Sequence, residues 1–168
     1  YFPFNNSSNL FKDDTIQKMQ LYINHGGILV FDCKASSESY FIEDCVEIIQ
    51  RRLVKLDISL PRKLFKEDTL SKSFYLLNEY PGRQNQDVYI ASNNQIVNDE
   101  VISLVIGNND WAGAWAKVGE NFQLPMLNGG ISQRNLSFRF GVNLVLYSLT
   151  GNYKADQVHI PEILKRMQ

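Results

Sequence analysis

The stretch Gly26-Gly27-Ile28-Leu29-Val30-Phe31-Asp32-Cys33-Lys34 decides the predicted fold. Two glycines of the kind that end a helix are followed by an unbroken apolar run, which is typical of a strand buried on both faces of an α/β sheet. The strand then ends on an acid, a thiol and a base. Because ligands bind at the carboxyl ends of strands in open parallel sheets, Asp32, Cys33 and Lys34 predict where a site would lie.

A second apolar run ends in the same way. Residues 101–106 are all apolar except Ser103, and Gly107-Asn108-Asn109-Asp110-Trp111 follows them. Ahead of the first buried strand, the sequence predicts a short strand and then a helix that begins at Asp13. A strand, a helix and a second strand form a crossover unit in which the two strands are parallel. If both buried strands are parallel, Asp32 and Asp110 lie at the same edge of the sheet.

The longest predicted helix runs from about Gln133 to Thr150 and is closed by Gly151. From Phe138 onward it is apolar nearly all round, which is expected of a helix packed between the sheet and other elements. Arg139 and Asn143, four residues apart, share a face and need partners if they are buried. Arg139 would be structural if paired with Asp110 or Asp32, and it would be an anion site if it faced an empty cleft.

Shorter helices are predicted at about 40–52 and 68–77, and Pro161 is predicted to begin a last short helix. Residues 55–66 predict an extended crossing without regular structure.

Composition favours one soluble domain over residues 1–168, with 44% hydrophobic residues. The 17 basic and 18 acidic residues give a net charge of -1, which is no footprint for nucleic acid or an anionic membrane. The two cysteines, Cys33 and Cys45, lack metal-ligand spacing, and we predict neither a metal site nor a cofactor. The opening Tyr1-Phe2-Pro3-Phe4 has the pattern of a strand whose start is missing, so we expect the C-terminal part of a longer protein.

Several motifs resemble the bacterial domain-of-unknown-function family 4159 over nearly the whole chain. They are Gly107-Asn108-Asn109-Asp110-Trp111-Ala112, the run 138–154 (FRFGVNLVLYSLTGNYK), Ser73-Phe74-Tyr75-Leu76-Leu77 and Pro81-Gly82-Arg83. The resemblance implies a three-layer α/β sandwich with a mainly parallel sheet, flavodoxin-like and class I glutamine amidotransferase-like. It also implies a bacterial protein that is membrane-associated through segments outside this chain.

The resemblance also places Cys33 on the nucleophile position of the amidotransferases. Asp32 and Lys34 replace the small neighbours that would build a strained, exposing turn. The run His159-Ile160-Pro161-Glu162 has one residue more than the His-x-Glu pair of those enzymes, and it follows the long helix where their pair precedes it. No intact Cys-His-Glu triad is therefore expected, and Cys33 is only a weak catalytic candidate.

Each candidate has a structural interpretation beside the functional one. Cys33 would simply fill the end of its strand. Asp32 and Asp110 would cap turns, or form a carboxylate pair for a metal or for acid/base chemistry. Trp111 and Trp115 would pack in the core, or form a stacking wall for a ring.

The sequence thus predicts a non-catalytic module with a degenerate amidotransferase-like site that binds an unknown small molecule or protein. The predicted site residues are Asp32, Cys33, Ser73, Asn109, Asp110, Trp111, Arg139 and Asn143. The alternative is a hydrolase or amidase that uses Cys33 or the Asp32/Asp110 pair. A third possibility is a structural domain that supports upstream parts and has no cleft.

Overall fold

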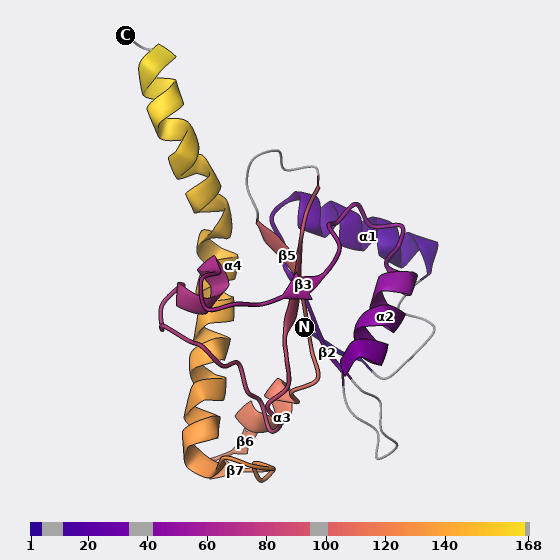
Figure 1. Ribbon diagram of the computed structural model, residues 1–168, viewed down its shortest axis with the longest axis vertical. Helices are drawn as coiled ribbons and strands as arrows, with labels where there is room; N and C mark the ends of the chain where they lie inside the picture. The colour runs from indigo at the N-terminus through magenta and orange to yellow at the C-terminus, as the bar shows by residue number, and fades with distance from the viewer. Residues whose placement is uncertain (5–11, 34–41, 95–100, 167–168) are drawn as a thin grey trace.

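A five-stranded sheet lies between two layers of helices in the computed structural model, which describes residues 1–4, 12–33, 42–94 and 101–166 (Figure 1). Helices α1 and α2 cover one face of the sheet, and the long helix α4 lies on the other. The elements are β1 (Phe2–Phe4), α1 (Asp13–Asn24), β2 (Leu29–Cys33), α2 (Ile42–Arg52), β3 (Arg62–Lys63), the 3₁₀ helix η2 (Thr69–Lys72), β4 (Tyr89–Ser92), β5 (Ile102–Gly107), α3 (Trp111–Trp115), β6 (Lys117–Val118), β7 (Asn121–Phe122) and α4 (Gly130–Arg166).

The sheet is mixed, which corrects the prediction of a mainly parallel sheet. Its strand order is β1-β2-β5-β4-β3, in which β1, β2 and β5 are parallel while β4 and β3 are antiparallel to their neighbours. The link from Ser92 to Ile102 is shorter than the dozen or more residues of a usual parallel crossover, so β4 and β5 pair antiparallel. The predicted parallel pairing of the two buried strands is confirmed, with Asp32 opposite Gly107.

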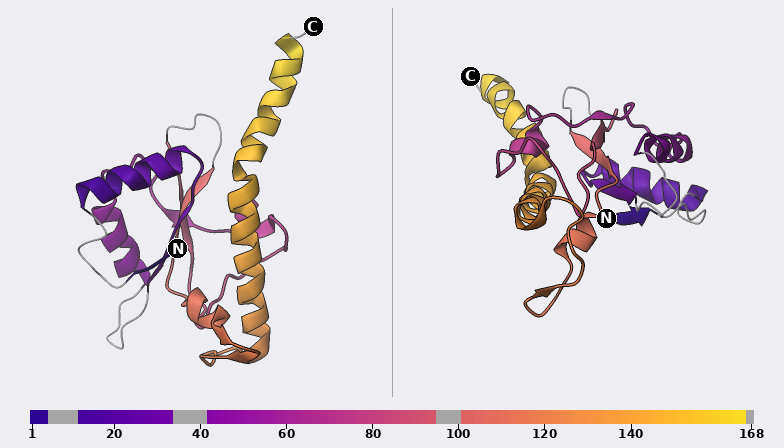
Figure 2. Two further views of the ribbon diagram at one scale, coloured as in Figure 1. Left: turned by 180° about the vertical axis from the view of Figure 1, so that it is seen from behind. Right: turned by 60° about the horizontal axis from the view of Figure 1, so that its bottom comes forward.

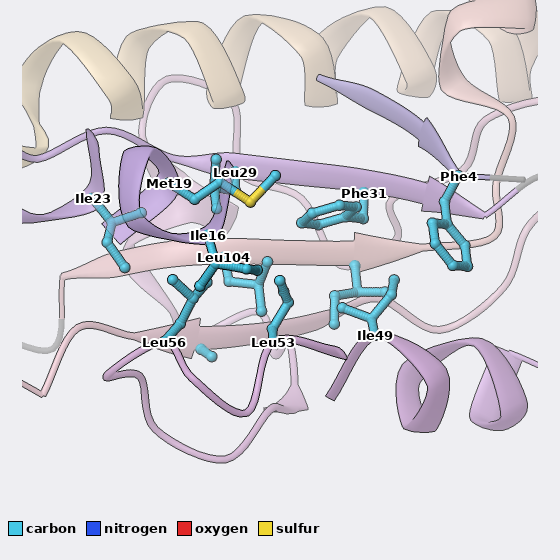
Figure 3. Packing of buried hydrophobic residues seen from close by; sticks show 12 residues of the cluster. Phe4, Ile16, Met19, Ile23, Leu29, Phe31, Ile49, Leu53, Leu56 and Leu104 are labelled. Carbon is cyan, nitrogen blue, oxygen red and sulfur yellow. The ribbon is translucent and has the colours of Figure 1, made fainter. Parts of the chain in front are cut away.

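Alternating residues of β2 enter two separate cores, as expected of a strand buried on both faces. Leu29 and Phe31 pack with residues of α1 and α2 (Figure 3). Val30 packs in the other core with Trp111 and Phe140, on the side of α4. The sheet is therefore apolar on both faces, and its polar residues gather where β2 and β5 end.

Helix α4 is much longer than predicted. It runs through Gly151, the predicted end, and through Pro161, the predicted start of a separate helix. Glycine permits the left-handed conformation that ends helices but does not impose it, and Pro161 removes only one bond from a ladder that continues on both sides. The C-terminal half of α4 extends beyond the sheet (Figure 2).

The side of α4 that faces away from the sheet is exposed, contrary to the prediction that the helix is covered all round. Phe140 and Tyr147 are buried against the sheet, whereas Val145 is 57% and Leu149 72% exposed. Among the described residues, no element packs over this apolar surface of the helix.

The helix predicted from Asp13 is confirmed as α1, and the helix expected at about 40–52 is α2. The helix expected at 68–77 is only the single turn η2, and residues 55–66 contain just the two-residue strand β3. None of the helices in the described part of the chain is both long enough and apolar enough to cross a membrane.

Candidate functional site

Asp32, at the end of β2, binds the turn that follows β5. Its buried carboxylate accepts hydrogen bonds from the backbone N–H groups of Asn109 (3.1 Å), Asp110 (3.0 Å) and Trp111 (2.7 Å). The Tyr1 hydroxyl donates a fourth hydrogen bond to it. The predicted meeting of the two strand ends is thus confirmed, and Asp32 caps the turn of the neighbouring strand.

Asp110 holds the start of α3. Its backbone is left-handed, with a φ of 53°, a conformation that aspartate tolerates better than most residues. Its side chain accepts a hydrogen bond from the N–H of Gly113 (3.2 Å), which makes it the N-cap of α3. The capping interpretation of Asp110 is therefore confirmed.

Arg83 is the cation that pairs with Asp110, and the sequence analysis did not assign it to the site. Its guanidinium lies 2.7 Å from the Asp110 carboxylate and donates a second hydrogen bond to the Pro125 carbonyl (2.9 Å). Gly82 lets this turn approach closely, because a Cβ there would collide with the backbone of Asn109. The sequence signal was a candidate carboxylate in need of a cation together with an arginine in the predicted turn Pro81-Gly82-Arg83.

The side chains of Asn109 and Trp111 are both fully buried, and both make hydrogen bonds within the chain. Asn109 accepts from the N–H of Gln86 (2.7 Å) and donates to the Gln86 carbonyl (3.2 Å). Trp111 donates to the Tyr80 carbonyl (2.9 Å) and packs on Phe140 with ring centroids 5.0 Å apart. Trp111 therefore belongs to the core. We call Asp32, Asn109, Asp110, Trp111, Tyr1 and Arg83 the Asp32 turn network.

Burial raises the pKa of Asp32 above its ordinary value, although its four donors act in the opposite direction. Burial also raises the pKa of the Tyr1 hydroxyl, and the adjacent Asp32 charge adds to that rise.

The carboxylate oxygens of the network already have hydrogen-bond partners. Both oxygens of Asp32 and both oxygens of Asp110 already accept hydrogen bonds from within the chain. A general base needs an oxygen within reach of the substrate's proton. In the part of the chain that the structure describes, no three His, Cys, Asp or Glu side chains group to hold a metal ion. The geometry therefore favours a structural role for the two aspartates.

Asn143, Ser73 and Arg139 lie in a second place, where α4 meets the segment around η2. The buried Asn143 amide accepts from the N–H groups of Phe74 (3.2 Å) and Tyr75 (2.8 Å) and donates to the carbonyls of Leu70 (3.0 Å) and Tyr75 (2.9 Å). The expected need of Asn143 for partners is thus met.

Ser73 donates to the Thr69 carbonyl (2.8 Å), within its own turn. Arg139 is exposed and lies over the Tyr75 ring, 5.3 Å from the centroid. Arg139 was expected inside a buried helix, and this is wrong because the side of α4 that carries it faces outward. Of the alternatives left open for Arg139, the pairing with Asp110 is made by Arg83 instead.

The structure does not test the predicted role of Cys33 as a nucleophile. The backbone of Cys33 ends β2, opposite Phe4, but the side chains of Cys33, Cys45 and His159 lie outside the described residues, as do residues 34–41. His25 follows α1 and so lies at the opposite end of β2 from Cys33. The nucleophile hypothesis for Cys33 stays a prediction.

An apolar groove lies beside α4, with a cavity volume of about 670 Å³. We call it the α4 groove. Its walls come from α4, α1, α3, the β1–β2 side of the sheet and the segment after η2, and they carry no acidic or basic side chain. The lining residues are Tyr1, Tyr22, Ile28, Val30, Phe74, Trp115, Phe138, Gly141, Val142, Leu144, Val145, Leu146 and Ser148.

Trp115 is the one predicted aromatic that lines this groove. Its indole N–H donates to the Ser137 carbonyl (3.0 Å), and its ring lies 6.2 Å from that of Tyr1. None of Asp32, Asn109 or Asp110 is part of the lining. The sequence analysis missed the groove because apolar residues such as Val145 were expected to be covered.

Comparison with known proteins assigns the chain to a family whose function is not known. No curated protein matches the chain. The family model described as "Domain of unknown function (DUF4159)" matches residues 1–149, which include the whole sheet, the Asp32 turn network and every residue that lines the α4 groove. The chain therefore belongs to this family of domains of unknown function.

Proposed function

We propose that this domain is a non-catalytic protein-interaction module that binds its partner through the α4 groove. The observation that carries the proposal is the groove itself: an open apolar surface without a charged lining residue, beside an outward helix face that nothing described covers. Large exposed apolar patches on soluble proteins mark interaction sites.

The Asp32 turn network supports the non-catalytic part of the proposal. Its carboxylates accept hydrogen bonds from donors of the same chain, and these bonds fix the shape of the turn. The proposal includes a relationship to class I glutamine amidotransferases, in which the strand end at Asp32-Cys33 has lost the enzyme's turn and now fastens β2 to the loop after β5.

A photo-crosslinking experiment in cells that normally produce the intact protein tests the proposal. The photoreactive p-benzoylphenylalanine replaces Val145 in the groove or, as a matched control, Val54, which is 77% exposed and does not line the groove. We expect protein adducts from position 145 and none of comparable yield from position 54. Equal yields from the two positions, or no adduct from position 145, would overturn the proposal.

A further inference from the structure

Within residues 130–150, where the side chains of α4 are described, the exposed apolar residues form one stripe along the helix, which we call the outer stripe. They are Ile131, Phe138, Val142, Val145 and Leu149, with exposed fractions of 77%, 37%, 38%, 57% and 72%. Their spacings of seven, four, three and four residues are those of the a and d positions of a coiled coil. At 100° per residue the stripe lies opposite the buried Phe140 and Tyr147.

This geometry favours a helix as the occupant over a small molecule. From Ile131 to Leu149 the stripe covers 18 residue steps, or about 27 Å at 1.5 Å per residue. The α4 groove covers only its middle, because Ile131 and Leu149 do not line the cavity. A small ligand in the groove would leave both ends of the stripe in water, whereas a helix laid along α4 would cover all of it.

The apolar area exposed by the groove and the outer stripe matches the area that each partner buries in a stable dimer. Tyr1, Tyr22 and Phe74 of the groove are 47%, 53% and 62% exposed. At roughly 150–200 Å² for a whole large side chain, these three residues and the stripe supply on the order of 800 Å². A stable interface of standard size takes about 800 Å² from each partner.

From these observations we infer that the occupant is α4 of a second copy of this chain, packed antiparallel along the outer stripe and the α4 groove. The inference rests on the proposed function and names its partner. A self-complementary stripe is what a two-fold symmetric interface uses, and such dimers are the commonest soluble oligomers.

The charges of residues 130–149 favour the antiparallel direction. Between residues 130 and 149 the only charged side chains are Arg134, which is buried, and Arg139, which is exposed. A parallel pair would hold Arg139 at the same height as Arg139 of the partner subunit, with no separation along the axis. In the antiparallel register that pairs Phe138 with the partner's Leu149, and Val142 with the partner's Val145, Arg139 lies opposite the partner's Ser148. The two arginines are then about 13 Å apart along the axis, beyond the screening length of about 10 Å at 0.1 M salt.

Analytical ultracentrifugation of the full chain tests the dimer. The variant Val145→Lys with Leu149→Lys places charges in the stripe at positions more than half exposed, so its fold is retained, which circular dichroism checks. The control Val54→Lys with Leu60→Lys makes the same change at positions that are 77% and 85% exposed elsewhere. We expect a dimer for the wild type and the control, and a dissociation constant at least about 100-fold higher for the stripe variant. A monomeric wild type, or an unchanged constant in the folded stripe variant, would overturn the inference.

Crosslinking from position 138 tests the direction and separates this inference from the proposed function. With p-benzoylphenylalanine in place of Phe138, the antiparallel register predicts a self-adduct to the peptide around Leu149 of the partner subunit; an adduct at the partner's own position 138 would contradict it. Adducts with a different protein and none with a second copy would leave the interaction module standing and refute the dimer. The absence of both kinds of adduct would refute both.

Discussion

The Asp32 turn network and the α4 groove differ in whether their side chains find contact partners within the same chain. In the network, each carboxylate, amide and indole described has its partner in the same molecule. In the groove, aromatic and aliphatic side chains line an open cavity of about 670 Å³. The carboxylates, the amide and the indole of the network therefore hold elements of the chain together, whereas the α4 groove is apolar. Substitutions in the network should cost stability, whereas substitutions in the groove should cost association.

Asp32→Ala is expected to have the largest effect on stability. It leaves three backbone N–H groups and the Tyr1 hydroxyl without their acceptor, at a cost of about 3–5 kcal/mol in the free energy of unfolding. Urea denaturation measures it. Asp14→Ala is the control, because Asp14 is 75% exposed in its pair with Lys18, and should change stability by at most about 0.5 kcal/mol. Similar losses in the two variants would contradict the structural role of Asp32.

Asn143→Ala should come next, because it removes four hydrogen bonds between α4 and the segment around η2. We expect a loss of about 2–4 kcal/mol in the free energy of unfolding, with faster amide hydrogen exchange at Phe74 and Tyr75. Asn135→Ala, at an exposed position of the same helix, should cost nothing measurable. Unchanged exchange at those two amides would show that Asn143 does not hold the segment.

Arg83→Met should cost about 1–2 kcal/mol. It keeps most of the apolar stem but leaves the Asp110 carboxylate, whose side chain is 20% exposed, without its cation. Arg51→Met is the matched control, since that arginine is 73% exposed and 3.7 Å from Glu47. Thermal unfolding of both variants compares the two losses, and an equal shift would place Arg83 among ordinary surface charges.

The pH dependence of Asp32 should give the smallest effect. Because burial raises its pKa in the folded state, the protonated form is favoured by folding. The stability that Asp32 contributes is then full below its ordinary pKa of 3.8 and declines as the pH rises through the raised value. The free energy of unfolding of the wild type minus that of Asp32→Asn should therefore fall with rising pH from about 4 upward. A difference that rises over this range would contradict the direction of the shift.

The sequence predicted the parts of the fold that depend on local pattern. The apolar run that ends in Asp32 gave a buried strand, the one before Gly107 gave its parallel neighbour, and both are confirmed. The direction of β4 was missed because it depends on which strands pair, and the short link from Ser92 to Ile102, which argues against a parallel crossover, was not weighed. The length of α4 was missed because Gly151 only permits a helix to end.

Part of the predicted site lies where it was expected, whereas Ser73, Arg139 and Asn143 lie elsewhere. The binding role of these residues stays a prediction. Asp32, Asn109, Asp110 and Trp111 do meet at the end of the sheet, as the strand ends indicated. The partners that occupy them, Arg83 and Tyr1 among others, come from distant parts of the chain and carry no local signal. The exposure of Val145 could not be predicted either, because an apolar helix face has the same sequence whether its own chain or another molecule covers it.

The span of the Asp32 hydrogen bonds has a consequence for how the chain folds. The carboxylate and the amides it binds are separated by 77 to 79 positions. Contacts of such separation form only after a large loop has closed, which slows their appearance. The left-handed bend at Asp110 thus acquires its support late, and kinetic experiments should find the 107–115 segment among the last to acquire protection during refolding.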